Sequence, residues 1–113
     1  MKSLNESVTK NNNPKIFTDE IIKFINTEGF EYGNNDSYCS GFLPSEYKYE
    51  DKCYKKNVHS DRYTINVYIF SFGIGVDFDY DCGGNSSNQF WTFDDYSFET
   101  AYDEMVDEVN DRR

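Results

Sequence analysis

Basic residues are missing from the part of the chain that holds most of its carboxylates. Between Tyr63 and Asp111 there are eleven Asp and Glu residues and not one Lys or Arg. Residues 1–62 are nearly balanced, so almost all of the net charge of −10 lies in residues 63–113. An electric field of that sign repels nucleic acid and anionic membranes and attracts basic proteins. The sequence therefore favours a basic protein as the partner, without direct contact to nucleic acid or a membrane.

Long apolar segments and paired cysteines are absent too. No apolar run approaches the roughly 20 residues that cross a bilayer, and the opening MKSLNES has no apolar segment typical of a secretory signal. Cys39, Cys53 and Cys82 are odd in number and show no CxxC spacing, which is typical of reduced thiols. These absences predict a cytoplasmic protein, in the bacterial host if the gene belongs to a phage.

The residue patterns of common enzymes and metal sites are also missing. His59 is the only histidine, and no Ser or Cys has the recognisable base and orienting group that nucleophilic catalysis needs. The glycines lack the Lys-Ser/Thr pair of a phosphate-binding loop. Counted from Asp77 as a calcium loop, the sixth position is Cys82 rather than Gly and the twelfth is Asn88 rather than Glu. We therefore expect a protein that is not an enzyme and has no cofactor or metal.

The length of 113 residues suits one domain with its own hydrophobic core. Residues 1–13 are polar and have no apolar periodicity, so we expect a mobile tail before a single domain over residues 14–113. Aromatic residues make up 19% of the chain, and side chains of this kind favour β-strands.

A first helix is expected after Thr18, which is a suitable N-cap followed by two acids where the helix dipole favours negative charge. Gly29 is suited to the left-handed conformation that ends many helices. The apolar side chains expected on the buried face are Ile21, Ile22, Phe24 and Ile25. We interpret this helix as structural.

Short alternating segments predict an antiparallel sheet. Residues 63–70 and 74–82 are expected as strands joined by a tight turn, and residues 89–93 as a last strand after the turn 83–88. Gly33–Asp36 is expected as another turn, and residues 38–43 as a short strand.

Residues 46–56 alternate weakly and form the only patch that mixes Lys with Tyr. Such patches can stack bases and pair with phosphates, but acids interrupt this one. A solvated edge strand, with lysines that discourage aggregation, is the interpretation that we favour.

The strand at 74–82 is expected to turn its apolar residues to the core. Because side chains alternate across a strand, the acids between them share the solvent face. These sheet aspartates are Asp77, Asp79 and Asp81. A weak divalent-ion site at this row is a lesser alternative.

A second helix closes the chain, capped by Asp94, Asp95 or Ser97. Its buried stripe at helical spacing is Phe98, Ala101, Tyr102, Met105, Val106 and Val109. Its outer side, which we name the C-terminal acidic face, is Glu99, Asp103, Glu104, Asp107, Glu108 and Asp111. Acids three and four residues apart repel each other, and those near the helix C-terminus oppose its dipole. The helix therefore carries a stability cost that a function would explain.

These elements predict an α+β fold: an antiparallel meander of four to five strands with an N-terminal and a C-terminal helix packed on one face. The sheet aspartates would then lie on the face opposite the C-terminal acidic face. We expect the helix carboxylates to be the main partner-binding group, with Asp94, Asp95 and the sheet aspartates as further candidates.

Carboxylates spaced about 6 Å apart along a helix are of the order of the charge spacing along nucleic acid. In general character the chain resembles the small acidic inhibitors that phages use against host nucleases and defence systems, such as anti-CRISPR or anti-restriction mimics, although no motif assigns it to one family. The expected function is therefore a non-catalytic inhibitor that blocks a basic, nucleic-acid-binding effector or nuclease. The alternatives are an immunity protein for a cognate toxin, and a small enzyme or divalent-metal module.

Overall fold

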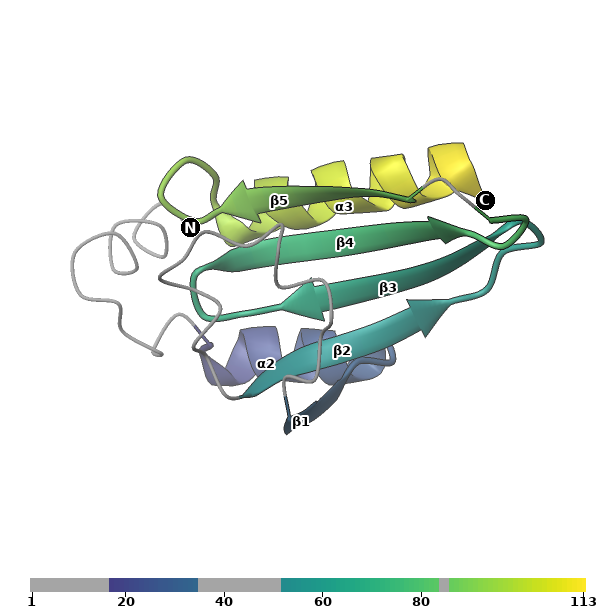
Figure 1. Ribbon diagram of the computed structural model, residues 1–113. Coiled ribbons are helices and arrows are strands. Elements are labelled where there is room, and N and C mark those ends of the chain that lie inside the picture. Colours follow the sequence, from purple (N-terminus) through teal and green to yellow (C-terminus); the bar gives the residue numbers. More distant parts are fainter. Residues whose placement is uncertain (1–16, 35–51, 84–85) are drawn as a thin grey trace.

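The computed structural model describes residues 17–34, 52–83 and 86–113, which form two helices and a five-stranded antiparallel sheet and confirm the α+β fold (Figure 1). The elements in chain order are α2 (Asp19–Thr27), β1 (Glu31–Asn34), β2 (Lys52–Val58), β3 (Tyr63–Ile69), β4 (Gly73–Tyr80), β5 (Ser86–Thr92) and α3 (Phe98–Arg112). The expected tail 1–13 and the expected strand 38–43 lie outside the described residues.

The sheet is a meander in which each strand pairs antiparallel with the next, in the order β1-β2-β3-β4-β5. Both helices lie on one face of it, as expected (Figure 1). The central register joins Ile65 to Phe78 and Val67 to Val76, so these apolar side chains point to the same face. They join the buried residues of α2 and α3 in the main core, which therefore lies between the sheet and the two helices.

Helix α2 has the boundaries that its sequence predicts. The Thr18 hydroxyl accepts a hydrogen bond from the Ile21 N–H at 3.3 Å and caps the N-terminus. At the other end Gly29 has a φ of 94°, and the Phe30 N–H donates back to the Ile25 carbonyl at 3.2 Å. After this left-handed termination, Phe30 is buried in the same core cluster as Ile25.

Helix α3 begins after Ser97 rather than after Asp94 or Asp95. The Ser97 hydroxyl accepts from the Thr100 N–H at 3.2 Å. The expected stripe is confirmed, because five of its residues are buried and Val106 is half-buried. No helix in the described part of the chain is long and apolar enough to cross a membrane.

Removing the α3 cap is expected to reduce stability measurably. Ser97→Ala leaves the Thr100 N–H without its acceptor at the helix N-terminus, which costs about 1 kcal/mol of unfolding free energy. Urea denaturation measures this loss. Asp95→Ala is the control and should stay within about 0.5 kcal/mol of the wild type. Equal losses for both variants would contradict the assignment of Ser97 as the cap.

Several strand boundaries differ from the sequence prediction, most clearly at β1 and β5. Gly33 and Asn34, expected in a turn, belong to β1, where Tyr32 pairs with Tyr54 of β2 and the ring centroids lie 4.7 Å apart. This aromatic pair stabilises a short strand on the outer side of β2, so β2 is not the edge strand expected from its lysines. Likewise Ser86, expected in the turn 83–88, already pairs with Asp79 and begins β5.

The opposite face of the sheet carries a smaller cluster of buried side chains. It consists of Cys53, Tyr68 and Phe70, with Phe72 and Phe90 packed against it. The sheet is therefore apolar on both faces at this end, which agrees with the largely apolar end of the segment 63–70.

Candidate functional site

The C-terminal acidic face lies on the side of α3 opposite its buried stripe. Five of its carboxylates are exposed and Glu108 is half-buried. Because the buried residues recur every three to four positions, they occupy one side of the helix and leave the acids together on the other. The structure thus brings the predicted helix acids onto one continuous surface.

No cation neutralises this surface within the described residues, where none of the six carboxylates forms an ion pair. Arg112 lies in the last turn of the same helix, but its guanidinium points to the sheet. It donates to the Ser87 hydroxyl at 2.7 Å and lies 4.6 Å from the centroid of the Phe78 ring. The basic residue nearest in sequence is therefore engaged in packing, and the acidic face keeps its charge.

The sheet aspartates do not form the exposed row that the sequence predicts. Asp79 is exposed, but Asp77 is only 8% exposed. Asp81 follows the end of β4 and accepts a hydrogen bond from the Thr64 hydroxyl at 2.9 Å. The expectation that all three share a solvent-facing strand surface is therefore wrong for Asp77.

The burial of Asp77 follows from the register of the central strand. Asp77 pairs with Asn66 on β3 and with Asn88 on β5, so side chains of similar length flank it on both sides. Asp79 pairs instead with Thr64 and with the short Ser86. Both aspartates lie on the face away from the helices, so they belong to a surface separate from the C-terminal acidic face.

The other candidate residues also lie apart from one another. Asp94 and Asp95 are exposed in the turn before α3. In the lysine-rich segment, Lys56 points to the helix side, where its Nζ lies 5.5 Å from the Phe30 ring centroid. Lys55 alternates to the opposite side of β2, so the described part of this segment forms no single basic patch.

No group of three His, Cys, Asp or Glu side chains gathers closely enough to hold a metal ion in residues 17–34, 52–83 and 86–113. The sole histidine, His59, is highly exposed in the β2–β3 connection, 3.7 Å from the Asp61 carboxylate. The side chain of Cys53 is buried and that of Cys82 is exposed, whereas Cys39 lies outside the described residues.

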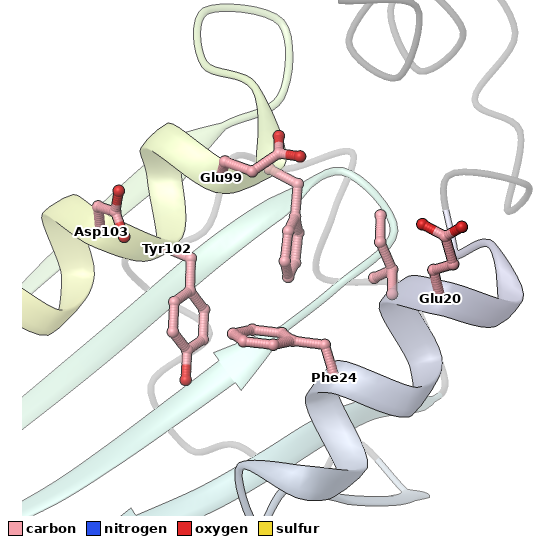
Figure 2. Close-up of a pocket in the computed structure, with 7 residues that line it drawn as sticks. Glu20, Phe24, Glu99, Tyr102 and Asp103 are labelled. Carbon is pink, nitrogen blue, oxygen red and sulfur yellow. The ribbon is translucent and has the colours of Figure 1, made fainter. Parts of the chain in front are cut away.

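A groove of about 360 Å³ lies between α2 and α3 (Figure 2). We name it the interhelical groove. Its apolar lining is Ile21, Phe24, Phe98 and Tyr102, and its acidic lining is Glu20, Glu99 and Asp103. Figure 2 shows Phe24 reaching from α2 toward Tyr102, with Glu20 and Glu99 on opposite walls. Two carboxylates of the C-terminal acidic face thus belong also to a groove.

Three aromatic rings give this groove its shape. The Phe24 ring meets Tyr102 edge-on at a centroid distance of 5.0 Å and Phe98 at 6.3 Å. Phe98 and Tyr102 are stacked at 5.9 Å. Phe24 was expected in the buried face of its helix, yet it is 40% exposed because the groove opens beside it. Sequence reasoning likewise assigned Glu20 only to the helix dipole and missed it as a groove residue.

Tyr102 separates the interhelical groove from a smaller cavity nearer the C-terminal end of α3. Its hydroxyl donates to Glu28 Oε1 at a long 3.5 Å and so connects α3 to the end of α2. Burial, then the charge and the hydrogen bond of Glu28, raise the pKa of Tyr102 to about 12. The hydroxyl is therefore a neutral donor at physiological pH.

The raised pKa of Tyr102 predicts a loss of stability in alkali. In the unfolded chain tyrosine ionises near pH 10, while folded Tyr102 stays neutral until about pH 12. The stabilising contribution is thus complete below pH 10 and is lost as the pH rises through 12. Ultraviolet titration should show a tyrosine step near pH 12 that Tyr102→Phe removes and the control Tyr80→Phe leaves in place. A late step that survives in Tyr102→Phe would contradict the assignment.

The interhelical groove and the C-terminal acidic face meet at Glu99 and Asp103 and form one candidate binding surface on the helix side of the molecule. The sheet aspartates form a second, weaker candidate on the other side. Comparisons of the chain with protein-family models, with curated proteins and with solved structures found no match.

Proposed function

We propose that this protein is a non-catalytic acidic inhibitor that covers a basic, nucleic-acid-binding surface of a partner protein. One observation carries the proposal: the C-terminal acidic face holds six carboxylates that form no ion pair within the described residues, although the helix contains Arg112. A helix that served only to cover the sheet would gain stability from lysines at these positions. The retained repulsion is accounted for if the face meets cations of another molecule.

The geometry of a helix suits the replacement of phosphates by carboxylates. Successive acids four residues apart rise by about 6 Å along the axis, within about twofold of the roughly 3.4 Å between charges along one strand of B-DNA. The scaffold is rigid, because α3 is capped by Ser97 and its buried stripe packs in the main core. A partner groove that binds phosphates can therefore receive these carboxylates without a large ordering cost.

Within this class we infer a phage anti-defence role, as an anti-CRISPR or anti-restriction type of nucleic-acid mimic that acts in the host cytoplasm. The support is the net charge of −10 and the gathering of six carboxylates on one helix face. The partner is then a basic nucleic-acid-binding effector or nuclease. The long-range field of the acidic face would raise the rate of encounter with such a partner.

The test is a competition with nucleic acid. A partner captured from the host cytoplasm is purified, and its binding to labelled nucleic acid is measured with increasing amounts of this protein. We expect nucleic acid to be displaced at stoichiometric amounts, and the affinity of the protein pair to fall steeply as salt rises from about 0.05 to about 0.5 M. A partner that keeps its nucleic acid, or an affinity that does not change with salt, would refute the proposal.

A further inference from the structure

The interhelical groove has a property that a charged helix face alone does not need. Its lining combines apolar and aromatic side chains with the acidic residues Glu20, Glu99 and Asp103. Phe24 is 40% exposed there and is one of two large apolar side chains exposed in the described residues. Exposed aromatic area next to unpaired carboxylates is typical of a surface that binds another molecule.

We propose that the interhelical groove receives an arginine side chain of the partner protein. The guanidinium stacks on the exposed Phe24 ring and pairs with carboxylates from both helices, Glu20 on α2 and Glu99 on α3. This inference rests on the proposed function, because it identifies the anchor by which the basic partner is held.

The size and charge of the groove select this occupant. A volume of about 360 Å³ is at the lower end of the range for small-molecule sites, so one long side chain fits better than a nucleotide. The three carboxylates exclude an anion by repulsion. A purely apolar anchor would bury these carboxylates without a partner, which is costly. A second copy of this chain carries the same net charge of −10 and would be repelled.

Arginine fits the groove better than lysine because its guanidinium is planar and weakly hydrated. It can stack on an aromatic ring and donate two parallel hydrogen bonds to a carboxylate at the same time. Lysine offers a strongly hydrated point charge that gains less from the rings. The groove therefore predicts that arginine binds more tightly than lysine, although both carry one positive charge. An acidic surface that acts only through its net charge predicts no such difference.

The walls of the groove are held in place by local structure. Helix α2 is fixed at one end by the Thr18 cap and at the other by the left-handed Gly29. Helix α3 is fixed by Ser97, and the hydroxyl of Tyr102 connects it to Glu28. An anchor therefore meets a site that is already formed, which lowers the entropic cost of binding.

The experiment compares two short blocked peptides, one with arginines alternating with glycines and one with lysines in the same positions. NMR titration follows the ring signals of Phe24 and Tyr102 in the whole protein. We expect the arginine peptide to bind several-fold more tightly than the lysine peptide and to shift these signals. Equal affinity for both peptides, or shifts confined to other residues, would overturn the proposal.

Two variants with the same change in net charge locate the site. Glu20→Gln, Glu99→Gln and Asp103→Asn together remove three charges from the groove. The matched control removes three charges from the rest of the C-terminal acidic face, through Glu104→Gln, Asp107→Asn and Asp111→Asn. The groove variant should weaken the arginine peptide about tenfold and the control about twofold. Equal weakening would show that the field of the helix, and not the groove, binds the peptide.

A change at Phe24 separates the ring from the charges. Phe24→Leu keeps an apolar side chain that packs between the helices but removes the aromatic face. The preference for arginine over lysine should then fall clearly, while the hydrogen bonds to the carboxylates preserve part of it and the protein stays folded. If the preference is as large as in the wild type, the aromatic part of the proposal is wrong.

The peptide titration and the nucleic-acid competition fail independently. The first result is that the wild type prefers the arginine peptide and the groove variant does not, while no basic partner releases its nucleic acid. The groove would then remain a binding site, and the proposed function would be wrong. Displacement without arginine selectivity would leave the function and remove the groove as its anchor.

Discussion

The variant Asp103→Lys/Glu104→Lys/Asp107→Lys/Glu108→Lys is expected to lose partner binding by on the order of 100-fold or more while remaining folded. Each exchange changes the charge by two, so the net charge of −10 becomes −2 and the centre of the C-terminal acidic face becomes basic. Attraction to a basic partner then turns into repulsion, both during encounter and in the complex. Surface plasmon resonance with the captured partner measures the loss, and most of it should appear at low salt.

The fold should survive this reversal because the four side chains lie on the outer side of α3. The four new lysines repel one another as the acids did, so that contribution is unchanged. Glu99 and Asp111 now face lysines three or four positions away and gain a few tenths of a kcal/mol per pair. Positive charge near the helix C-terminus is also favourable to the dipole. We therefore expect a melting temperature equal to that of the wild type or slightly higher.

The matched control reverses four exposed acids away from α3. These residues are Glu31, Asp61, Asp79 and Asp81. The control has the same net charge as the helix variant and includes two of the sheet aspartates, so it separates the position of the charge from its amount. Binding should fall only several-fold. A loss as large as that of the helix variant would mean that net charge, or the far side of the sheet, carries the interaction.

The fold could be predicted from the sequence because its signals are local. Thr18 and Gly29 bound α2 through side-chain and backbone chemistry within a few residues. Along β3 and β4 the side chains alternate between the two faces, and this local pattern alone predicts that Val67 and Val76 lie on the core face. Strand β1 could not be predicted in this way, because it depends on the pairing of Tyr32 with Tyr54, two residues that are far apart in the sequence.

The interhelical groove could not be predicted because it joins residues far apart in the chain. Successive helix residues are rotated by about 100°, so on α2 Phe24 lies about 80° from the midline between Ile21 and Ile25. That angle places Phe24 at the edge of the buried face, and only the position of α3 decides whether its ring is covered. Asp77 shows the same limit in the sheet. Strand alternation predicts on which face of the sheet its side chain lies, but its burial depends on the neighbouring Asn66 and Asn88.

Gly73→Ala is expected to cost about 3 kcal/mol of unfolding free energy, the largest loss expected from any single exchange proposed for this protein. A Cβ at Gly73 would lie 2.5 Å from the Phe90 Cζ and 2.5 Å from the Trp91 carbonyl oxygen. The ring can move a little, but the carbonyl belongs to β5, which pairs with β4 along its whole length. Gly73 therefore lets Phe90 cross over the start of β4 and pack against the smaller cluster around Phe70.

Gly→Ala exchanges at two other positions serve as controls, because they introduce a Cβ without a steric clash. Gly33→Ala meets no atom within 4 Å and no unusual backbone angle, so the free energy of unfolding should stay within about 0.5 kcal/mol of the wild type. Gly83→Ala also enters open space, but the φ of 92° costs an L-residue about 1 kcal/mol. Urea denaturation should therefore order the losses as Gly73, Gly83, Gly33. If Gly73→Ala is no worse than Gly33→Ala, Phe90 does not pack across Gly73 and the apolar cluster on the far face of the sheet is built differently.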